Sequence, residues 1–495
     1  MSSAIVVGSD CRYRGEQVGP IRVFRGIPYG VAARFGKPRP VELPAELDCE
    51  RFAAACPQPR GGPQLVPGLE PVGDLDEDCL ALNVWTPDGA DQLPVIVWIH
   101  GGSFLIGTSA SPTYDGARLA ADGAVVVSIQ YRVGPFGFVD LRSLGDDVVA
   151  NAGLHDVIGA LEWIREHIGV FGGDPNRVTV MGESAGGGVI LHLLGHADRY
   201  RWFDRAIVQS GSTGRTFDAE SSALIARRFL AASECDTVAE LRTRPAERLV
   251  AASVGLQADP EVWANAGMMP FHPCIDGSLV LESPERALQR GTNAGCDLVL
   301  GSTRDEMQLF LTDATIEAGR LVRRVAKYLG IADDAATAVT RRYESTLTRT
   351  GRRAEPIDVW GAIYSDREMV LPARAALDAA AIAHAATFGY RFDWTAPPRP
   401  DCRPVGAAHG VDIPFTFGNF DAEWAAFLGG HDGERRRLSD AVRAAWVAFA
   451  ATGDPTNSVT GTWPRWAARR EGVVFDTSVR VEVDPLGARG AALVP

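Results

Sequence analysis

The sequence predicts an α/β fold, with an open, mostly parallel central sheet that has helices on both faces. Three observations support this prediction. Runs of consecutive apolar residues, typical of strands buried on both faces, recur along the chain. Stretches with helical periodicity separate these runs, and such alternation is typical of a parallel sheet. The β-branched run at 178–180 is followed by a tight glycine-rich turn and an apolar helix, which indicates close packing of a strand against a helix.

The chain up to about residue 60 is expected to form short strands and turns, beginning with the β-branched run at 5–7. Glycine and proline are concentrated at 58–71, which predicts a loop over the surface or at the rim of a site. Residues 76–85 alternate into a strand, and the apolar run at 95–99 predicts a buried parallel strand.

Strands and helices alternate through the rest of the chain. Helical periodicity is clear at 151–167, where apolar residues are spaced by three or four: Leu154, Ile158, Leu161 and Ile164. Further buried strands are predicted at 124–129, 206–208, 298–300 and 388–392.

Two long stretches, at about 221–290 and 316–386, are expected to be helical insertions large enough to form a lid or an acyl pocket. The candidate site residues lie far apart in the sequence and must meet in one place. We therefore expect all 495 residues to form a single domain, although length alone would suggest about three.

Composition excludes several classes of partner. The net charge of −13 and the absence of a basic run argue against nucleic acid. No apolar run reaches the roughly 18 residues of a membrane span, and the N-terminus lacks the pattern of a secretory signal. Eight cysteines in so long a chain do not make a disulfide scaffold, and no Cys-x-x-Cys pair indicates zinc. We expect a cytoplasmic protein.

The clearest candidate for chemistry is Ser184. Gly182 and Gly186 flank it two positions away on either side, which is the nucleophile-elbow pattern. Glycine is abundant, at 53 of 495 residues, so the five-residue pattern alone is weak evidence and could mark a turn without chemistry. The strand before it and the helix after it are the context that the motif requires. The sequence therefore predicts that Ser184 is a nucleophile.

A serine nucleophile needs a base, and the base needs a carboxylate to orient it. In this pattern the serine, the acid and the histidine follow one another in that order along the chain. Three histidines follow a plausible acid: His384 lies in an alanine-rich helix and His431 in a glycine-rich turn, whereas His409 lies in a small-residue loop after a strand. His409 is therefore the preferred base. For the acid, Asp305 and Glu306 both follow a strand end, and spacing does not choose between them.

An oxyanion that develops during the reaction needs backbone N–H donors. The segment 100–104, His-Gly-Gly-Ser-Phe, follows a buried strand and is the glycine-rich loop that supplies them, together with the N–H of Ala185. His100 precedes both the nucleophile and the acid in the sequence, so we interpret it as structural.

Several long motifs occur together in the order of a known family. They resemble the type-B carboxylesterases, the para-nitrobenzyl-esterase-like relatives of cholinesterases, which have the α/β-hydrolase fold. The resemblance extends from residue 24 to residue 464. Its motifs are Gly-Glu-Ser-Ala-Gly-Gly, the His-Gly-Gly-Ser-Phe loop, and the segments 77–84, 171–176 and 409–415.

The resemblance implies roles for individual residues. It assigns the catalytic acid to Glu306 and the oxyanion donors to Gly102, Ser103 and Ala185. Glu183 and Ser210 match positions near the catalytic histidine, where they either tune it or only pack around it.

The chain also departs from the family pattern. Ser103 replaces a third glycine, and serine tolerates a positive φ less well. Met307 replaces the glycine after the acid, where it narrows the pocket or makes it more apolar. Val157 follows Asp156 where glutamine is usual, which leaves the partner of Asp156 open.

Cys56 and Cys79 match the first disulfide pair of secreted family members. A reducing cytosol favours thiols, whereas a buried bridge could still form, so both states stay open here. Cys235 resembles one member of the second bridge of the family, without an evident partner.

The sequence predicts a serine carboxylesterase that acts on a small-molecule ester through an acyl-enzyme and needs no metal or organic cofactor. Hydrolysis of carbamates or aryl amides is the alternative within the same chemistry. A non-catalytic, cholinesterase-like binding module is the alternative of another class. The sequence does not specify the substrate or an oligomeric state.

Overall fold

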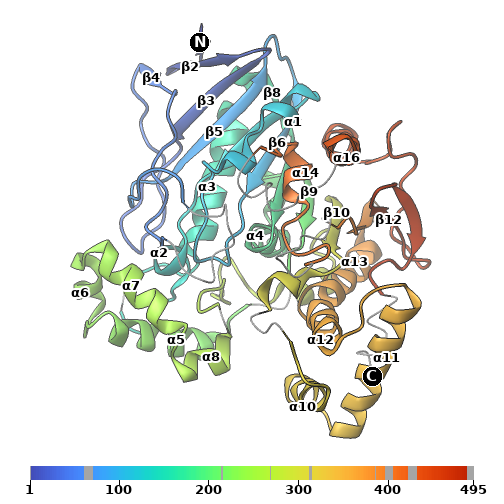
Figure 1. Ribbon diagram of the computed structural model, residues 1–495. Helices are drawn as coiled ribbons and strands as arrows, with labels where there is room; N and C mark the ends of the chain where they lie inside the picture. The colour runs from blue at the N-terminus through green and yellow to red at the C-terminus, as the bar shows by residue number, and fades with distance from the viewer. Residues whose placement is uncertain are drawn as a thin grey trace.

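A mostly parallel sheet forms the centre of the molecule (Figure 1). The computed structural model describes residues 2–60, 71–145, 147–212, 216–267, 269–311, 315–384, 386–395, 405–421 and 432–487. Within these residues the sheet has thirteen strands, in the order β1-β2-β3-β5-β7-β6-β8-β9-β10-β11-β12-β13, with β4 beside β2. The strands from β7 to β12 run parallel, as the sequence predicts.

Antiparallel strands complete the sheet at both edges. The sequence predicted short strands near the N-terminus but not β12, β13 or the long helix α16. The strands are β1 (Ser2–Val7), β2 (Arg12–Val18), β3 (Ile21–Pro28), β4 (Glu46–Asp48), β5 (Ala81–Pro87), β6 (Leu93–Ile99), β7 (Val125–Ile129), β8 (Gly173–Glu183), β9 (Arg205–Gln209), β10 (Asp297–Thr303), β11 (Thr387–Phe392), β12 (Glu471–Phe475) and β13 (Arg480–Val483).

The central strands of the sheet are buried on both faces, and apart from Ser128 the residues of β6 and β7 are apolar. Alternate residues of β6 enter different cores: Val95, Val97 and Ile99 pack with α3 (Ala152–His167) and α4 (Ala185–Leu194). Ile96 and Trp98 point to the other face and share a core with α16 (Asp432–Thr452). Helices therefore cover both faces.

Helices occupy both stretches that were expected to be insertions. In the first are α5 (Ala219–Ala232), α6 (Val238–Thr243), α7 (Ala246–Leu256), α8 (Pro260–Ala266) and α9 (Pro284–Gln289). In the second are α10 (Ala318–Leu329), α11 (Asp333–Arg349), α12 (Pro356–Ser365), the π-helical turn η5 (Asp366–Val370) and α13 (Leu371–Ala383). Figure 1 shows α5–α8 at the lower left and α10–α12 at the lower right. The single-domain organisation stays a prediction.

Short helices fill the connections between strands. Those before the nucleophile segment are η1 (Pro112–Tyr114), α1 (Ala117–Ala121), α2 (Gly134–Phe138) and η2 (Ile168–Phe171). Those after it are η3 (Arg199–Arg201), η4 (Glu306–Phe310) and α14 (Ile413–Phe417). In the part of the chain that is described, no helix is both long and apolar enough to cross a membrane.

The structure has Cys56 and Cys79 as free, buried thiols rather than as a bridge. A hydrogen bond with Cys56, together with burial, raises the pKa of the Cys79 thiol well above its ordinary value. Cys235 is also free and buried.

The partner of Asp156, which the sequence left open, is Arg132. Asp156 on α3 accepts two hydrogen bonds from the guanidinium, from Nε and Nη2, each 2.7 Å long. The side chains are 4% and 0% exposed, so this is a fully buried pair. Arg132 Nη2 also donates to the carbonyl of Gly36, which ties the N-terminal segment to α3.

We expect Asp156→Ala to lower the free energy of unfolding by about 3–5 kcal/mol, because it leaves the Arg132 charge buried without its partner. Urea unfolding followed by tryptophan fluorescence measures this loss. The control is Asp48→Ala, which breaks an exposed pair with Arg14 and should cost about 1 kcal/mol or less. Equal losses in the two variants would contradict the expectation.

Candidate active site

Ser184 lies between the end of β8 and the start of α4, in a strained conformation with φ 57° and ψ −122°. The strain follows from a close approach of the flanking backbone. A Cβ at Gly186 would lie 2.0 Å from the carbonyl oxygen of Ile99, and one at Gly182 would lie 2.9 Å from the same atom. Only glycine fits at these positions. A serine held at positive φ is typical of a functional turn and costs about 1–3 kcal/mol.

The glycine-rich loop after β6 packs directly against this turn. A Cβ at Gly101 would lie 3.0 Å from the Cβ of Ser184. Gly102, Ser103 and Phe104 all have positive φ, at 117°, 58° and 57°. Ser103 therefore has a positive φ, which serine adopts less readily than glycine does. In the described part of the chain, the N–H groups of Gly102, Ser103 and Ala185 donate to no protein acceptor.

His100, which the sequence analysis interpreted as structural, lies beneath this loop. It is fully buried and stacks on Tyr131 with ring centroids 4.4 Å apart. Burial lowers the pKa of His100 to about 4, so its ring is neutral at physiological pH.

The carboxylate of Glu306 is fully buried at the start of η4, just beyond β10. Its Oε1 accepts hydrogen bonds from the hydroxyl of Ser210 at 2.6 Å and from the N–H of Thr303 at 2.8 Å. Its Oε2 accepts from Nδ1 of His409 at 2.5 Å. Of the two carboxylates that spacing left open, Glu306 is therefore the one that contacts the histidine. Ser210 contacts the acid and not the imidazole ring.

His409 presents its two ring nitrogens to different carboxylates. Nδ1 faces Glu306, and Nε2 lies 3.1 Å from Oε1 of Glu183, the residue before Ser184. The backbone N–H of His409 donates to the carbonyl of Glu306, and the ring packs beside Phe310. Of the other histidines considered, His384 pairs with Asp297, away from Glu306, and His431 lies outside the described residues.

Burial and like charge shape the titration of this cluster. Burial raises the pKa of Glu183 to about 8, and the charges of Asp412 and Glu306 add to the effect. Burial opposes charge on His409, but the carboxylates of Glu183 and Glu306 outweigh it and raise the pKa of His409 to about 9. Burial, with the charge of Glu306, raises the pKa of Asp412 to about 6. Such shifts are typical of functional sites.

Asp412 lies within the sequence motif 409–415, and the sequence predicts no role for it. It is buried, and its Oδ2 accepts a hydrogen bond from Gln209 at 2.9 Å. Gln209 Nε2 also donates to Thr416, so β9 and α14 are joined beside the histidine. The sequence feature that could have identified Asp412 is a carboxylate three residues after His409, at the start of a helix.

A cavity of about 840 Å³ lies beside this cluster, between the two groups of inserted helices. Met307, next to Glu306, and Phe310, next to His409, belong to its wall. His272 reaches the wall from the first insertion and packs on Phe104 of the glycine-rich loop. Five aromatic side chains also contribute to its lining, beside polar and charged residues such as Arg324, Arg367 and Glu368: Phe217, Trp263, Tyr328, Trp360 and Tyr364.

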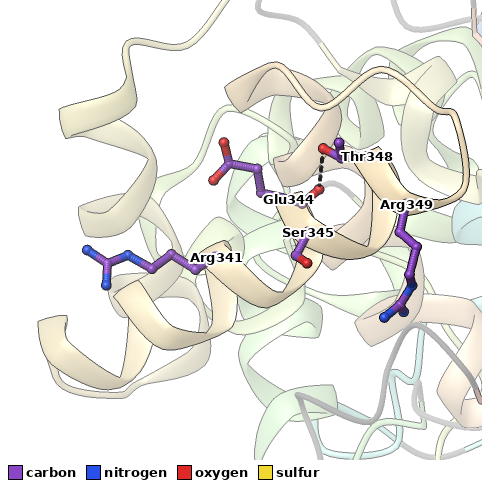
Figure 2. Close-up of a pocket in the computed structure, with 5 residues that line it drawn as sticks. All are labelled: Arg341, Glu344, Ser345, Thr348 and Arg349. Atoms are coloured by element: carbon purple, nitrogen blue, oxygen red, sulfur yellow. Dashed lines mark hydrogen bonds between the residues drawn. The ribbon is translucent and has the colours of Figure 1, made fainter.

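Figure 2 shows a different hollow, of about 520 Å³, on the outer side of α11. It is lined by Arg341, Glu344, Ser345, Thr348 and Arg349, all exposed and all from this one helix. The hydrogen bond drawn there joins the Thr348 hydroxyl to the Glu344 carbonyl of the same helix. None of the candidate site residues contributes to it, so we do not consider it a candidate active site.

The fold and this cluster define a class: an α/β-hydrolase, with a serine on the strand-to-helix turn and a histidine–carboxylate pair. The comparisons with known proteins agree with this fold class. The model of the Carboxylesterase family matches residues 1–483, so the chain belongs to the carboxylesterase family. It is a serine carboxylesterase, a hydrolase of carboxylic esters.

Curated relatives cover nearly the whole chain. It is 34% identical to the para-nitrobenzyl esterase of Bacillus subtilis (strain 168), over 100% of this chain and 99% of that protein. It is 32% identical to a phenmedipham hydrolase of Pseudarthrobacter oxydans, over 90% of this chain and 89% of that protein. It is 30% identical to a fumonisin B1 esterase of Sphingopyxis macrogoltabida, over 93% and 84%.

Solved structures confirm the predicted α/β-hydrolase fold. A para-nitrobenzyl (PNB) esterase superposes with a TM-score of 0.83 at 33% identity. A carboxylesterase of Geobacillus stearothermophilus superposes with a TM-score of 0.85 at 32% identity. In both comparisons 99% of each chain is covered.

We expect Glu183→Gln to move the acidic limb of the pH profile of kcat/KM to lower pH. The carboxylate beside Nε2 favours the protonated imidazole, so its removal lowers the pKa of His409 and leaves the neutral ring available at lower pH. An opposite charge this close shifts a pKa by about one unit or more. Stopped-flow ester hydrolysis between pH 5 and pH 10 measures the limb.

As a control, Asp412→Asn should shift the same limb in the same direction but less, because Asp412 ranks behind both glutamates in its effect on His409. An unchanged limb in Glu183→Gln, or one that moves to higher pH, would contradict the electrostatic account.

Proposed function

We propose that Ser184, His409 and Glu306 are the catalytic triad of this carboxylesterase, with Gly102, Ser103 and Ala185 as the oxyanion hole. The observation that carries the proposal is the 2.5 Å hydrogen bond from His409 Nδ1 to a buried carboxylate that is itself held by Ser210 and Thr303. This leaves Nε2 on the side of the serine turn, where a base must act.

In the proposed reaction, Ser184 Oγ attacks the ester carbonyl while His409 Nε2 takes its proton. The tetrahedral oxyanion accepts hydrogen bonds from the free N–H groups of Gly102, Ser103 and Ala185. His409 then gives the proton to the departing alcohol, and an acyl-enzyme remains. Water, deprotonated by the same imidazole, attacks the acyl carbonyl; the bond from the acyl carbon to Ser184 Oγ then breaks, His409 returns the proton to Oγ, and the carboxylic acid is released. Glu306 orients the imidazole and stabilises the imidazolium in both steps.

Glu183 places a second carboxyl group beside the imidazolium. Its carboxylate lies 3.1 Å from Nε2 and raises the pKa of His409, whereas Glu306 both attracts the charged ring and accepts the hydrogen bond from Nδ1. We therefore assign orientation of the base to Glu306 and tuning of its pKa to Glu183.

We infer that the substrate is a small-molecule ester with an aromatic or other apolar group. The large cavity beside Met307 and Phe310 supports this, because aromatic walls favour such groups. Relatives named para-nitrobenzyl esterase and phenmedipham hydrolase agree with a substrate of this kind. Carbamates and aryl amides present the same carbonyl to the same groups and are the alternative substrates. The cytoplasmic location stays a prediction.

We expect Ser184→Ala to lower kcat/KM for p-nitrophenyl acetate and butyrate by about 10⁴-fold or more, because it removes the nucleophile. Release of p-nitrophenol measures the loss. An aryl carbamate and an anilide assayed with the same enzyme rank the three leaving groups. The control is Ser253→Ala, a buried serine on α7 that bonds only its own helix, and it should keep wild-type activity.

Substantial turnover by folded Ser184→Ala would show that another group is the nucleophile. A folded wild type that is inert towards all these compounds would instead reject the proposed substrate class.

We expect Met307→Ala to shift selectivity towards bulkier esters. Met307 is 8% exposed and forms the wall of the cavity beside the acid, so its truncation adds space near the reacting carbonyl. The ratio of kcat/KM for a benzoyl ester to that for an acetyl ester should rise by about tenfold, the lower end of what a few methylenes are worth in an apolar pocket. The ratio cancels differences in active fraction, and an unchanged ratio would contradict a role for Met307 in selectivity.

A further inference from the structure

We propose that Asp305, the residue before the catalytic acid, is a positioning residue that holds the histidine loop against the acid. This inference rests on the proposed triad and adds a residue to it. Asp305 is 1% exposed, and it joins two segments that are far apart in the sequence: η4, with Glu306, and the loop 405–410, with His409.

Asp305 bonds this loop through both its backbone and its side chain. Its N–H donates to the carbonyl of Ala407 at 2.8 Å, and its Oδ2 accepts from the N–H of Ala407 at 3.2 Å. One residue further along, the N–H of His409 donates to the carbonyl of Glu306 at 3.1 Å. The backbones that carry acid and base are therefore bonded to each other at the residues of the 2.5 Å side-chain contact and just before them in each segment.

The loop is shaped to admit this carboxylate. Gly406 has φ 67°, and a Cβ at that position would lie 2.4 Å from Oδ2 of Asp305. The glycine thus lets the loop approach the carboxylate closely and turn around it. A side chain at 406 would push the loop, and His409 with it, away from the acid.

The carboxylate is fixed on its other side by arginines. Its Oδ2 accepts from Arg304 Nε at 3.1 Å, and its Oδ1 accepts from Arg352. Arg352 lies in the connection between α11 and α12, within the second insertion. Charge-assisted hydrogen bonds of this kind are short and directional. Arg352 of the insertion therefore holds Asp305 in place, and Asp305 in turn holds the histidine loop.

A neighbouring aspartate offers a matched control. Asp393 is also buried, at 3% exposed, and also binds arginines: Arg391 at 2.5 and 2.7 Å, Arg480 at 3.5 Å and Arg304 at 3.7 Å. In the part of the chain described, however, it forms no hydrogen bond or ion pair with residues 405–410. It belongs to the same network of charges without a polar bond to the loop that carries the base.

The test compares Asp305→Ala, Asp305→Asn and Asp393→Asn in the full-length enzyme. We expect Asp305→Ala to lower kcat by about 10- to 100-fold, with KM within about twofold of wild type, because a small displacement of the base slows chemistry more than binding. Its acidic limb should move to lower pH as His409 loses contact with Glu306. Asp305→Asn, which retains an acceptor for Ala407, should recover part of the rate. Asp393→Asn should keep the wild-type kcat and pH limb.

A second readout does not depend on turnover. The proton on Nδ1 of His409, in its short bond to Glu306, should give a one-dimensional NMR resonance far downfield of the amides, identified by its loss in His409→Gln. We expect that resonance to weaken or move upfield in Asp305→Ala and to persist in Asp393→Asn. Should the wild type hydrolyse no ester, the proposed function fails, and this resonance still tests the role of Asp305.

Two results would overturn the proposal. The first is wild-type kcat, pH limb and resonance in Asp305→Ala. The second is an equal loss in Asp393→Asn, which would mean that the charge network acts on stability in general. Urea unfolding of each variant establishes that the compared proteins are folded.

Discussion

The structure depends on one close approach of backbone to backbone, where β8 turns into α4 over the end of β6. Gly186 meets the carbonyl of Ile99 at a distance that excludes any side chain. This contact fixes the direction of α4 and forces Ser184 into its strained conformation. Because parallel strands end at the same edge of a sheet, the segments after β6, β9 and β10 bring the glycine-rich loop, Ser210 and Glu306 to that edge.

At this edge, carboxyl groups are buried around a single imidazole, and they differ in the hydrogen bonds that each receives. Glu306 receives hydrogen bonds from Ser210, Thr303 and His409, so its negative charge is stabilised without water. Glu183 lies beside the imidazole, and burial raises its pKa. Neighbouring carboxyl groups thus differ in how well their negative charge is stabilised, because each receives different hydrogen bonds. The same difference separates Glu306, which we propose to orient the base, from Glu183, which we propose to tune it.

The sequence predicted those parts of the site that are local in the chain. The elbow around Ser184 and the loop containing Gly102 and Ser103 need glycines at fixed spacing, and this spacing is visible without a structure. The choice between Asp305 and Glu306 was not visible, because adjacent carboxylates differ only in which way each side chain points across the fold. In the structure Glu306 points to His409 and Asp305 to Ala407.

The fold shows the same limit. Apolar runs identified the central parallel strands, because those strands are buried on both faces and their pattern is continuous. β12 and β13 were missed for different reasons: β12 is buried but only five residues long, whereas β13 at the edge is four residues long and partly exposed. The partner of Asp156 could not be predicted from the sequence. Arg132 lies 24 residues earlier, and only the tertiary structure brings the two side chains into contact.

The second insertion links substrate selection to catalysis. Tyr328, Trp360 and Tyr364 line the cavity, and the same helical segment supports the acid. Ser365, at the end of α12, accepts a hydrogen bond from the N–H of Met307 at 2.9 Å, and Arg352 holds Asp305. The π-helical turn η5 follows Ser365 directly and contributes Arg367 and Glu368 to the cavity lining. A change that reshapes this wall therefore also acts on the segment that positions Glu306, which couples the range of substrates to the rate of the reaction.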